Sequence, residues 1–287
     1  MSAANPAIDA DLERAYLGGQ GRPHWPATIA RLAAASAEVL AGSGVARDLA
    51  YGPHPRQRFD LVPAVGPTRG VVLHLHPGYW QMRDRTGFAC LAPVFTTRGC
   101  DAVFADYPLA PEASVAEITE AARGIVPAVA AESRRRHGRV LPIVACGHSA
   151  GGHLAIELAM TDRVARGEDC PPIAAVIALS GVFDLAPLVA TSLNVKLGLD
   201  AAAARAASPI RRVGAIGAPA LIAVGGGETA AFHDQSRAMA AAWAAAGHAI
   251  RLEIVGDDDH FSLLDTLRDP ASALAQAVAE TIATAVG

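Results

Sequence analysis

Gly147-His148-Ser149-Ala150-Gly151-Gly152 is the most informative segment of the 287-residue sequence. It follows the apolar run Leu141–Cys146 and leads into a helical pattern that begins at Ala150. A serine on such a tight turn needs small residues two positions before and after it, because the strand and the helix would otherwise clash. The segment therefore predicts a strand–turn–helix unit that raises the Ser149 hydroxyl above a sheet. A glycine-rich turn that carries a serine by chance is the plain alternative.

Apolar runs alternate with helical patterns along the chain. Arg47–Tyr51 and Gln57–Val62 are separated by Gly52-Pro53-His54-Pro55, which is typical of a hairpin turn. Six further runs are almost continuously apolar, as buried parallel strands are: Val71–His76, Ala102–Tyr107, Leu141–Gly147, Ile173–Ser180, Ala220–Gly225 and Ile250–Val255. Helical patterns lie between or after these runs, at Gly87–Thr97, Val115–His137, Ala150–Ala165, Gln235–Ala246 and Ala271–Ala285. The alternation predicts a doubly wound α/β fold with helices on both faces of a mostly parallel sheet.

Two segments do not fit this alternation, namely residues 1–45 and residues 183–215. Their helical patterns are Asp9–Leu17, Pro26–Leu40, Leu185–Leu197 and Ala201–Ala207. We expect a single domain over residues 1–287, in which these two segments form a small helical cap above the strand ends. Simple surface helices are the alternative for both.

Composition narrows the chemistry that the chain can perform. It has 24 Lys+Arg against 28 Asp+Glu, a net charge of −4 and 52% hydrophobic residues, which indicates a globular protein without a nucleic-acid partner. The single lysine, Lys196, does not follow a glycine, so no phosphate-binding P-loop is present. The run Arg134–Arg136 is typical of a solvated helix end, with an anion site as the alternative. The four cysteines are too far apart in sequence for a zinc or redox pair: Cys90, Cys100, Cys146 and Cys170.

The sequence gives no sign of secretion or of a membrane span. The first residues include Asp9, Asp11 and Glu13 and lack the apolar core of a signal peptide. Glycine or proline interrupts every apolar stretch before it reaches about 18 residues, the length a membrane helix requires. We therefore expect a cytoplasmic protein with reduced thiols and no membrane partner. A homodimer is compatible with the sequence.

Residues after Ser149 supply candidates for the groups that would activate it. A serine hydroxyl is a weak nucleophile, so it needs a base, and the base needs an orienting acid. For this kind of turn the chain order is serine, acid, histidine. His260 is the candidate base because it lies in a polar loop after the last predicted strand. His233 and His248 fall within or at the end of a predicted helix, where a surface histidine is the simpler interpretation.

Glu228 is the candidate acid, since it follows the predicted strand Ala220–Gly225 on a glycine-rich turn. Such a position lets a carboxylate approach the histidine from the side. Asp184 follows the preceding strand and is a weaker rival, and Asp234 lies further into the next helix. Asp257–Asp259 are too close in sequence to the histidine for a relaxed approach to its ring.

An enzyme that transfers acyl groups must also stabilise a tetrahedral oxyanion. We expect one donor to be the backbone N–H of Ala150, directly after the serine. Further donors are expected from the loop after Val71–His76, which runs His76-Pro77-Gly78-Tyr79-Trp80. Gly78 lets the backbone approach a substrate oxygen closely. An ordinary strand-ending turn is the alternative for this loop.

With these segments identified, the sequence resembles α/β-hydrolases, and more narrowly the arylformamidase (kynurenine formamidase) and hormone-sensitive-lipase-like carboxylesterase group. The resemblance extends from about residue 10 to the C-terminus and rests on Tyr51-Gly52, Pro55–Asp60, His76–Trp80, Asp106–Glu112, Gly147–Gly152, Glu228 and His260-Phe261. It implies an α/β-hydrolase fold with an eight-stranded, mostly parallel sheet.

The sequence departs from the family pattern at two positions. The family loop usually reads His-Gly-Gly, whereas Pro77 stands in the middle here and has no N–H to donate. The resemblance implies that the donors are the next two residues, Gly78 and Tyr79, so an oxyanion hole can survive. Glu228 stands where many members have aspartate, and its longer side chain can still reach a histidine.

We also expect aromatic side chains around a substrate. Tyr79, Trp80, Phe183 and Phe261 are expected in the substrate pocket, although Tyr79 or Trp80 can pack into the core instead.

Together these features favour a serine hydrolase, without metal or cofactor, that cleaves short-acyl esters or aryl formamides. Ser149 would be the nucleophile, His260 the base and Glu228 the acid that orients it. A general carboxylesterase with no role in tryptophan breakdown is the alternative among enzymes. A non-catalytic ligand receptor is the alternative of another class, although such receptors usually lose one member of the triad.

Overall fold

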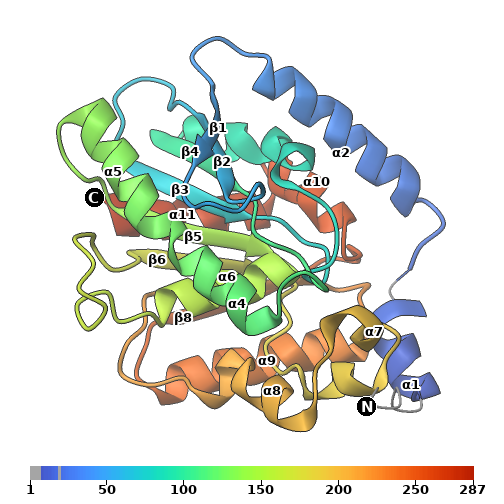
Figure 1. Cartoon of the computed structure of the whole chain (residues 1–287). Coiled ribbons are helices and arrows are strands. Elements are labelled where there is room, and N and C mark those ends of the chain that lie inside the picture. The colour runs from blue at the N-terminus through green and yellow to red at the C-terminus, as the bar shows by residue number, and fades with distance from the viewer. Residues whose placement is uncertain (1–7, 19–20) are drawn as a thin grey trace.

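One sheet organises the protein (Figure 1). The computed structural model describes residues 8–18 and 21–287. Within these ranges the sheet has eight strands in the order β1-β2-β4-β3-β5-β6-β7-β8. The strands are β1 (Ala46–Ala50), β2 (Arg58–Val62), β3 (Gly70–Leu75), β4 (Cys100–Ala105), β5 (Ile143–His148), β6 (Ala175–Leu179), β7 (Ala220–Gly225) and β8 (Ile250–Val255).

The predicted fold class and the eight predicted strands are confirmed. β2 pairs antiparallel with β1 and with β4, and all other neighbouring strands are parallel. Each strand begins within two residues of the segment that predicted it. Strands β3 to β7 are buried along their whole length, as almost continuous apolar runs predict.

Helices cover both faces of the sheet, and each face has its own hydrophobic core. One face carries α4 (Val115–Arg123), α5 (Ile125–His137), α6 (Ala150–Ala159) and α9 (Ala230–Ala245). The other carries α2 (Trp25–Leu40), α3 (Ala92–Thr96), α10 (Ser262–Arg268) and α11 (Ala273–Val286). Successive residues of a strand point to opposite faces of the sheet, so Val72 and Leu73 on β3 pack into different cores. Among the described residues, no helix combines the length and apolarity needed to cross a membrane.

The expected helix Val115–His137 is divided into α4 and α5 at Gly124. Pro127 explains the break, because its ring would clash with the carbonyl of Arg123 and it has no N–H to donate to it. The Arg123 carbonyl instead accepts a hydrogen bond from Arg163 Nη1 at 3.1 Å.

Other helical predictions also differ from the structure. α6 ends at Ala159 rather than Ala165, and α9 begins at Ala230, five residues before the predicted start. α10 was not predicted, because its seven residues Ser262–Arg268 are too few to show a helical period clearly.

The two segments outside the alternation contact each other. The N-terminal segment forms α1 (Ala10–Glu13) and a π-helical turn, η1 (Arg14–Gly18), and the second segment contains η4 (Ala186–Ala190), α7 (Asn194–Leu197), α8 (Ala201–Ala206) and η5 (Pro209–Arg211). The Glu13 carboxylate accepts hydrogen bonds from the backbone N–H of Ser192 at 2.9 Å and from its hydroxyl at 2.6 Å. Figure 1 shows α1 and α7 together at one end of α9.

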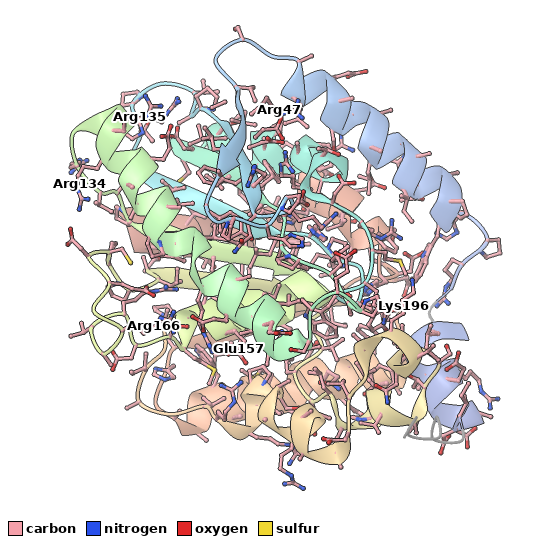
Figure 2. The ribbon with its side chains drawn as sticks, in the orientation of Figure 1. Arg47, Arg134, Arg135, Glu157, Arg166 and Lys196 are labelled. Atoms are coloured by element: carbon pink, nitrogen blue, oxygen red, sulfur yellow. The ribbon has the colours of Figure 1, made fainter. Side chains whose placement is uncertain are left out.

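The arginines at the end of α5 belong to a solvated helix terminus. Arg134 and Arg135 project from the rim of the molecule in Figure 2. Arg135 pairs with Glu132 at 2.6 Å and Arg134 with Asp169 at 3.3 Å, so neighbouring carboxylates already engage both charges.

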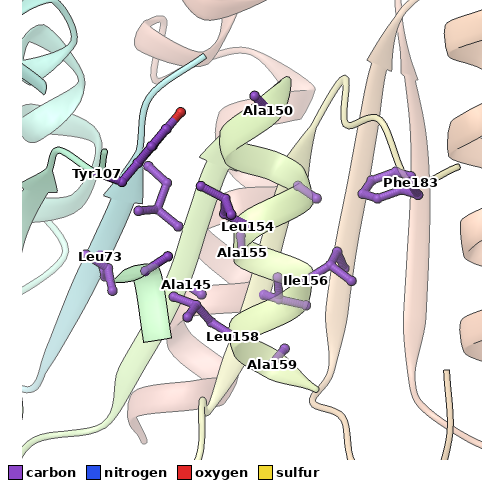
Figure 3. Packing of buried hydrophobic residues seen from close by; sticks show 14 of the residues in the cluster. Leu73, Tyr107, Ala145, Ala150, Leu154, Ala155, Ile156, Leu158, Ala159 and Phe183 are labelled. Atoms are coloured by element: carbon purple, nitrogen blue, oxygen red, sulfur yellow. The ribbon is translucent and has the colours of Figure 1, made fainter. Parts of the chain in front are cut away.

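The connection from β5 to α6 brings backbone segments into very close contact. Ser149 has φ 57° and ψ −118°, a conformation that few residues with a side chain adopt. A Cβ atom on Gly147 would lie 2.0 Å from the Gly151 carbonyl oxygen, and one on Gly151 would lie 2.0 Å from the Leu75 carbonyl oxygen. Glycine at these two positions lets α6 pack directly on the ends of β5 and β3. Figure 3 shows the apolar side chains of α6, including Leu154, Ile156 and Leu158, in the resulting core.

We expect Gly151→Ala to destabilise the protein, although alanine by itself favours a helix by about 1 kcal/mol. The new methyl group meets backbone rather than a movable side chain, so we expect a net loss of about 3 kcal/mol in the free energy of unfolding, measured by urea denaturation. Gly87→Ala is the matched control, because a Cβ at Gly87 has no atom within 4 Å. Equal stability of the two variants would contradict this account of the turn.

Candidate functional site

A cavity of about 170 Å³ lies beside the β5–α6 turn. Aromatic and apolar side chains form most of its wall, and three polar side chains, those of Ser149, His260 and Arg83, reach it. The described residues that line it are Tyr16, Leu17, Trp25, Pro77, Gly78, Tyr79, Met82, Arg83, Ser149, Phe232, His260 and Phe261. The fold thus brings the predicted nucleophile and the predicted base to one cavity.

His260 and Glu228 are joined by a short hydrogen bond. His260 Nδ1 lies 2.7 Å from Glu228 Oε2, and both side chains are buried. Glu228 follows β7 and His260 follows β8, so the parallel pairing of these strands places both residues at the same edge of the sheet. Gly225 is needed at this edge, since a Cβ atom there would lie 2.2 Å from the Asp258 carbonyl oxygen.

The surroundings of Glu228 favour its ionised form. Burial alone would raise the pKa of Glu228, but the nearby His260 and hydrogen bonds from the Ser180 hydroxyl and the Gly225 N–H hold the pKa below its ordinary value. An ionised carboxylate at Nδ1 fixes the proton there and leaves Nε2 of His260 as the acceptor on the other side of the ring.

The rival carboxylates have other partners. Asp184 accepts hydrogen bonds from Arg211 at 2.8 Å and from Ser208 at 3.3 Å. Asp234 is exposed on α9, and its nearest cation is Arg237 at 4.0 Å. Asp259 accepts hydrogen bonds from the indole of Trp25 and from the backbone of α10.

The two rival histidines contact backbone carbonyls. His233 Nε2 lies 3.3 Å from the Gly226 oxygen, and His248 Nε2 lies 2.8 Å from the Gly214 oxygen. Neither residue lines the cavity as the described residues form it.

The loop after β3 presents backbone donors beside Ser149. Gly78, Tyr79 and Trp80 have consecutive positive φ values of 132°, 49° and 58°. Within the described residues, the N–H groups of Gly78 and Tyr79 have no backbone acceptor. Ala150 is the first residue of α6, where an N–H has no partner inside the helix. Gly78 and Tyr79 line the cavity together with Ser149, and Ala150 directly follows Ser149 in the chain.

Trp80 and Phe183 were expected to line the pocket, and the structure places both in the hydrophobic core instead. Both side chains are fully buried, and Trp80 makes an edge contact with the ring of His153 at 5.0 Å between centroids. The Phe183 ring packs against Gly181, where a Cβ atom would lie 2.2 Å from it, and Figure 3 shows it on the far side of α6 from Tyr107. Large aromatic side chains gain more from complete burial than from a partly open wall.

Sequence reasoning missed Tyr16, Trp25, Met82, Arg83 and Phe232, which also line the cavity. Met82 and Arg83 lie in the loop after β3, so their position in sequence could have indicated them. Tyr16 and Trp25 come from the N-terminal segment, for which the strand–helix alternation gives no placement.

Comparison with known proteins places this geometry in a family. A family described as the alpha/beta hydrolase fold matches residues 72–264. The chain belongs to that family. It is 28% identical over 232 residues to a kynurenine formamidase of Danio rerio, covering 77% of this chain and 76% of the relative.

Solved structures agree with this assignment. A putative thioesterase from Silicibacter sp. TM1040 superposes with a TM-score of 0.82 at 31% identity, over 93% of this chain and 98% of the other. An esterase of the bacterial hormone-sensitive lipase family gives a TM-score of 0.64 at 22% identity, over 91% and 99% of the two chains, which shows the shared fold. The chain is therefore a member of a hydrolase family with esterase and formamidase relatives.

We expect Glu228→Gln to change how the free energy of unfolding depends on pH. Because folding lowers the pKa of Glu228, its ionised form adds stability above the ordinary glutamate pKa of about 4.3. That contribution is lost as the pH falls through the lower pKa of the folded state. Urea denaturation should therefore show a larger loss for the wild type than for Glu228→Gln between about pH 6 and pH 3.

Asp184→Asn is the control for this measurement. Asp184 is only partly buried and pairs with Arg211, and such pairs contribute little to stability. Its pH curve should follow that of the wild type. Equal losses in the wild type and in Glu228→Gln would contradict the electrostatic account of Glu228.

Proposed function

We propose that the protein is a serine hydrolase that cleaves short-acyl esters or aryl formamides through an acyl-enzyme. The observation that carries the proposal is the 2.7 Å contact of His260 Nδ1 with the buried carboxylate of Glu228, at a cavity whose wall also includes Ser149. A base held in this way on the wall that carries a serine on a strained turn is the arrangement that nucleophilic acyl transfer requires.

Each residue then has a defined role in the reaction. His260 Nε2 takes the proton of Ser149 as its oxygen attacks the substrate carbonyl, and later gives that proton to the leaving group. Glu228 keeps the other histidine nitrogen protonated and stabilises the imidazolium. The N–H groups of Gly78, Tyr79 and Ala150 stabilise the oxyanion. Water, activated by the same histidine, then releases the acid and restores the serine.

The size of the cavity supports short acyl groups. About 170 Å³ is below the range of roughly 300–1,000 Å³ that pockets for drug-sized ligands occupy. Its aromatic wall suits a flat leaving group, and the kynurenine formamidase relative supports a formyl group among the acyl groups. A general carboxylesterase remains the alternative, because it would use the same residues.

We expect Ser149→Ala to lower kcat for ester hydrolysis by on the order of 10⁴-fold, because the nucleophile is removed. The variant should fold normally, since alanine has a Cβ atom like serine. A fluorophosphonate probe should label the wild type and should not label Ser149→Ala. Retention of more than about a tenth of the activity by a clean preparation of the variant would exclude the serine mechanism. Absence of labelling in the wild type would favour a non-catalytic receptor.

A panel of substrates tests the proposed specificity. We expect kcat/KM for p-nitrophenyl esters to be highest at acetyl or butyryl and to fall at octanoyl and lauryl, since the cavity leaves little room for a longer chain. N-formylkynurenine and a short acyl thioester belong in the same panel. A maximum at octanoyl or above would contradict the narrow acyl site. Turnover of the esters without turnover of the formamide would favour the general carboxylesterase.

A further inference from the structure

Arg83 is the one arginine on the wall of the cavity as the described residues form it. It lies five residues after Gly78 in the loop after β3, and its guanidinium carbon is 4.9 Å from the centre of the Phe261 ring. Its backbone carbonyl accepts a hydrogen bond from Arg56 Nη2 at 2.7 Å, so the main chain that carries it is anchored. The side chain is thus held against the aromatic wall next to the proposed catalytic centre.

Among the described residues, the Arg83 guanidinium makes no hydrogen bond or ion pair, and only burial shifts its pKa. Arg85, two positions later, contacts three carboxylates, those of Asp48, Asp60 and Asp106. Asp84 directs its carboxylate to the backbone and hydroxyl of Thr86 rather than to Arg83. The carboxylates near this loop therefore bind Arg85 or Thr86 and not Arg83.

Burial without a counter-charge is unfavourable for an arginine. Arg83 is partly buried, and this burial lowers the pKa of its guanidinium because no anion offsets the loss of solvent. Of the residues described as lining the cavity, none is aspartate or glutamate. A partly desolvated guanidinium among aromatic rings is suited to bind a planar carboxylate through two parallel hydrogen bonds.

The position of Arg83 relative to His260 indicates which part of a substrate it would meet. Phe261 makes an edge contact with the His260 ring at 5.4 Å between centroids, and Arg83 lies over Phe261. His260 gives its proton to the leaving group, so the leaving group must lie on the histidine side of the scissile bond.

We propose that Arg83 binds a carboxylate on the leaving group, so that the site prefers anionic aryl esters or aryl formamides over neutral analogues of the same size. This inference rests on the proposed hydrolase function and specifies its substrate class. The plain alternative is that Arg83 only covers the wall with its aliphatic stem and its contact with Phe261.

The test compares the 2-, 3- and 4-acetoxybenzoates with their methyl esters, which keep the shape and remove the charge. Acetyl release is measured as kcat/KM for the wild type, Arg83→Gln and Arg83→Lys. For each protein, kcat/KM for the acid is divided by kcat/KM for its methyl ester. Dividing this ratio in a variant by the ratio in the wild type cancels the different reactivity of the two leaving groups. We expect this quotient to be about 0.1 to 0.01 for Arg83→Gln with the best isomer, mostly through KM, and intermediate for Arg83→Lys.

Arg205→Gln is the matched control, because Arg205 is exposed on α8 and loses the same unit of charge away from the cavity. Its quotient should stay near one. A quotient near one for Arg83→Gln would overturn the proposal, and an equal fall for Arg205→Gln would assign the effect to overall charge.

A second measurement separates failure of this inference from failure of the proposed function. Calorimetry measures binding of the hydroxybenzoates and their methyl esters to Ser149→Ala with and without Arg83→Gln, and it needs no turnover. We expect Arg83→Gln to weaken binding of the best acid by about tenfold or more and to leave the methyl ester less affected. Equal weakening of acid and ester, or none, would overturn the role of Arg83. A third outcome separates the two proposals. If Arg83→Gln removes the preference for the acid in binding, but the wild type hydrolyses no acetoxybenzoate or methyl ester, the role of Arg83 is supported and the hydrolase function is refuted.

Discussion

The contact between the start of α6 and the end of β3 is the constraint on which the site depends. A Cβ atom on Gly151 would lie 2.0 Å from the Leu75 carbonyl oxygen, so the helix begins where the third strand ends. β3 and β5 are parallel neighbours, and the loops that follow them therefore leave the same edge of the sheet. Under the proposed function, the N–H of Ala150 and the donors of the loop after β3 act on one oxyanion, and this contact is what brings the two loops together. The strained conformation of Ser149 is the local consequence of the same approach.

A buried cluster of charges holds the loop after β3 in place. Asp106 accepts hydrogen bonds from the Arg85 backbone at 2.7 Å and from its side chain, and Arg56 connects the same carboxylate to the carbonyl of Arg83. Burial raises the pKa of Asp106 although both arginines act to lower it, which shows how far from solvent the cluster lies. Removal of one partner would leave an uncompensated buried charge, so the cluster fixes one loop conformation. Two stretches that carried the resemblance, around Arg56 and Asp106, therefore have a structural reason to occur together.

Sequence alone predicted what depends on local pattern and chain order. Buried parallel strands appear in the sequence as apolar runs. The order of Ser149, Glu228 and His260 follows from the order of the strands that precede them. Local pattern does not predict whether an aromatic side chain packs into the core or faces the cavity. Trp80 follows two residues with positive φ, and its burial beside His153 depends on a helix more than 70 residues away. The role proposed for Arg83 could not be predicted from sequence either, because only the tertiary structure shows which arginines have no carboxylate partner.

The N-terminal segment determines how small the cavity is. Tyr16 is tied to the loop after β3, since the Tyr79 hydroxyl donates to its carbonyl at 2.5 Å, and to α9, since Gln235 donates to its hydroxyl at 2.9 Å. Trp25 is tied to the other side of the site, since its indole donates to Asp259, the residue directly before His260. One short segment thus contacts both the loop with the proposed oxyanion donors and the loop with the proposed base. Under the proposed function, selection for short acyl groups then depends on Tyr16 and Trp25, which close the cavity, and not on Trp80, which the sequence had placed there.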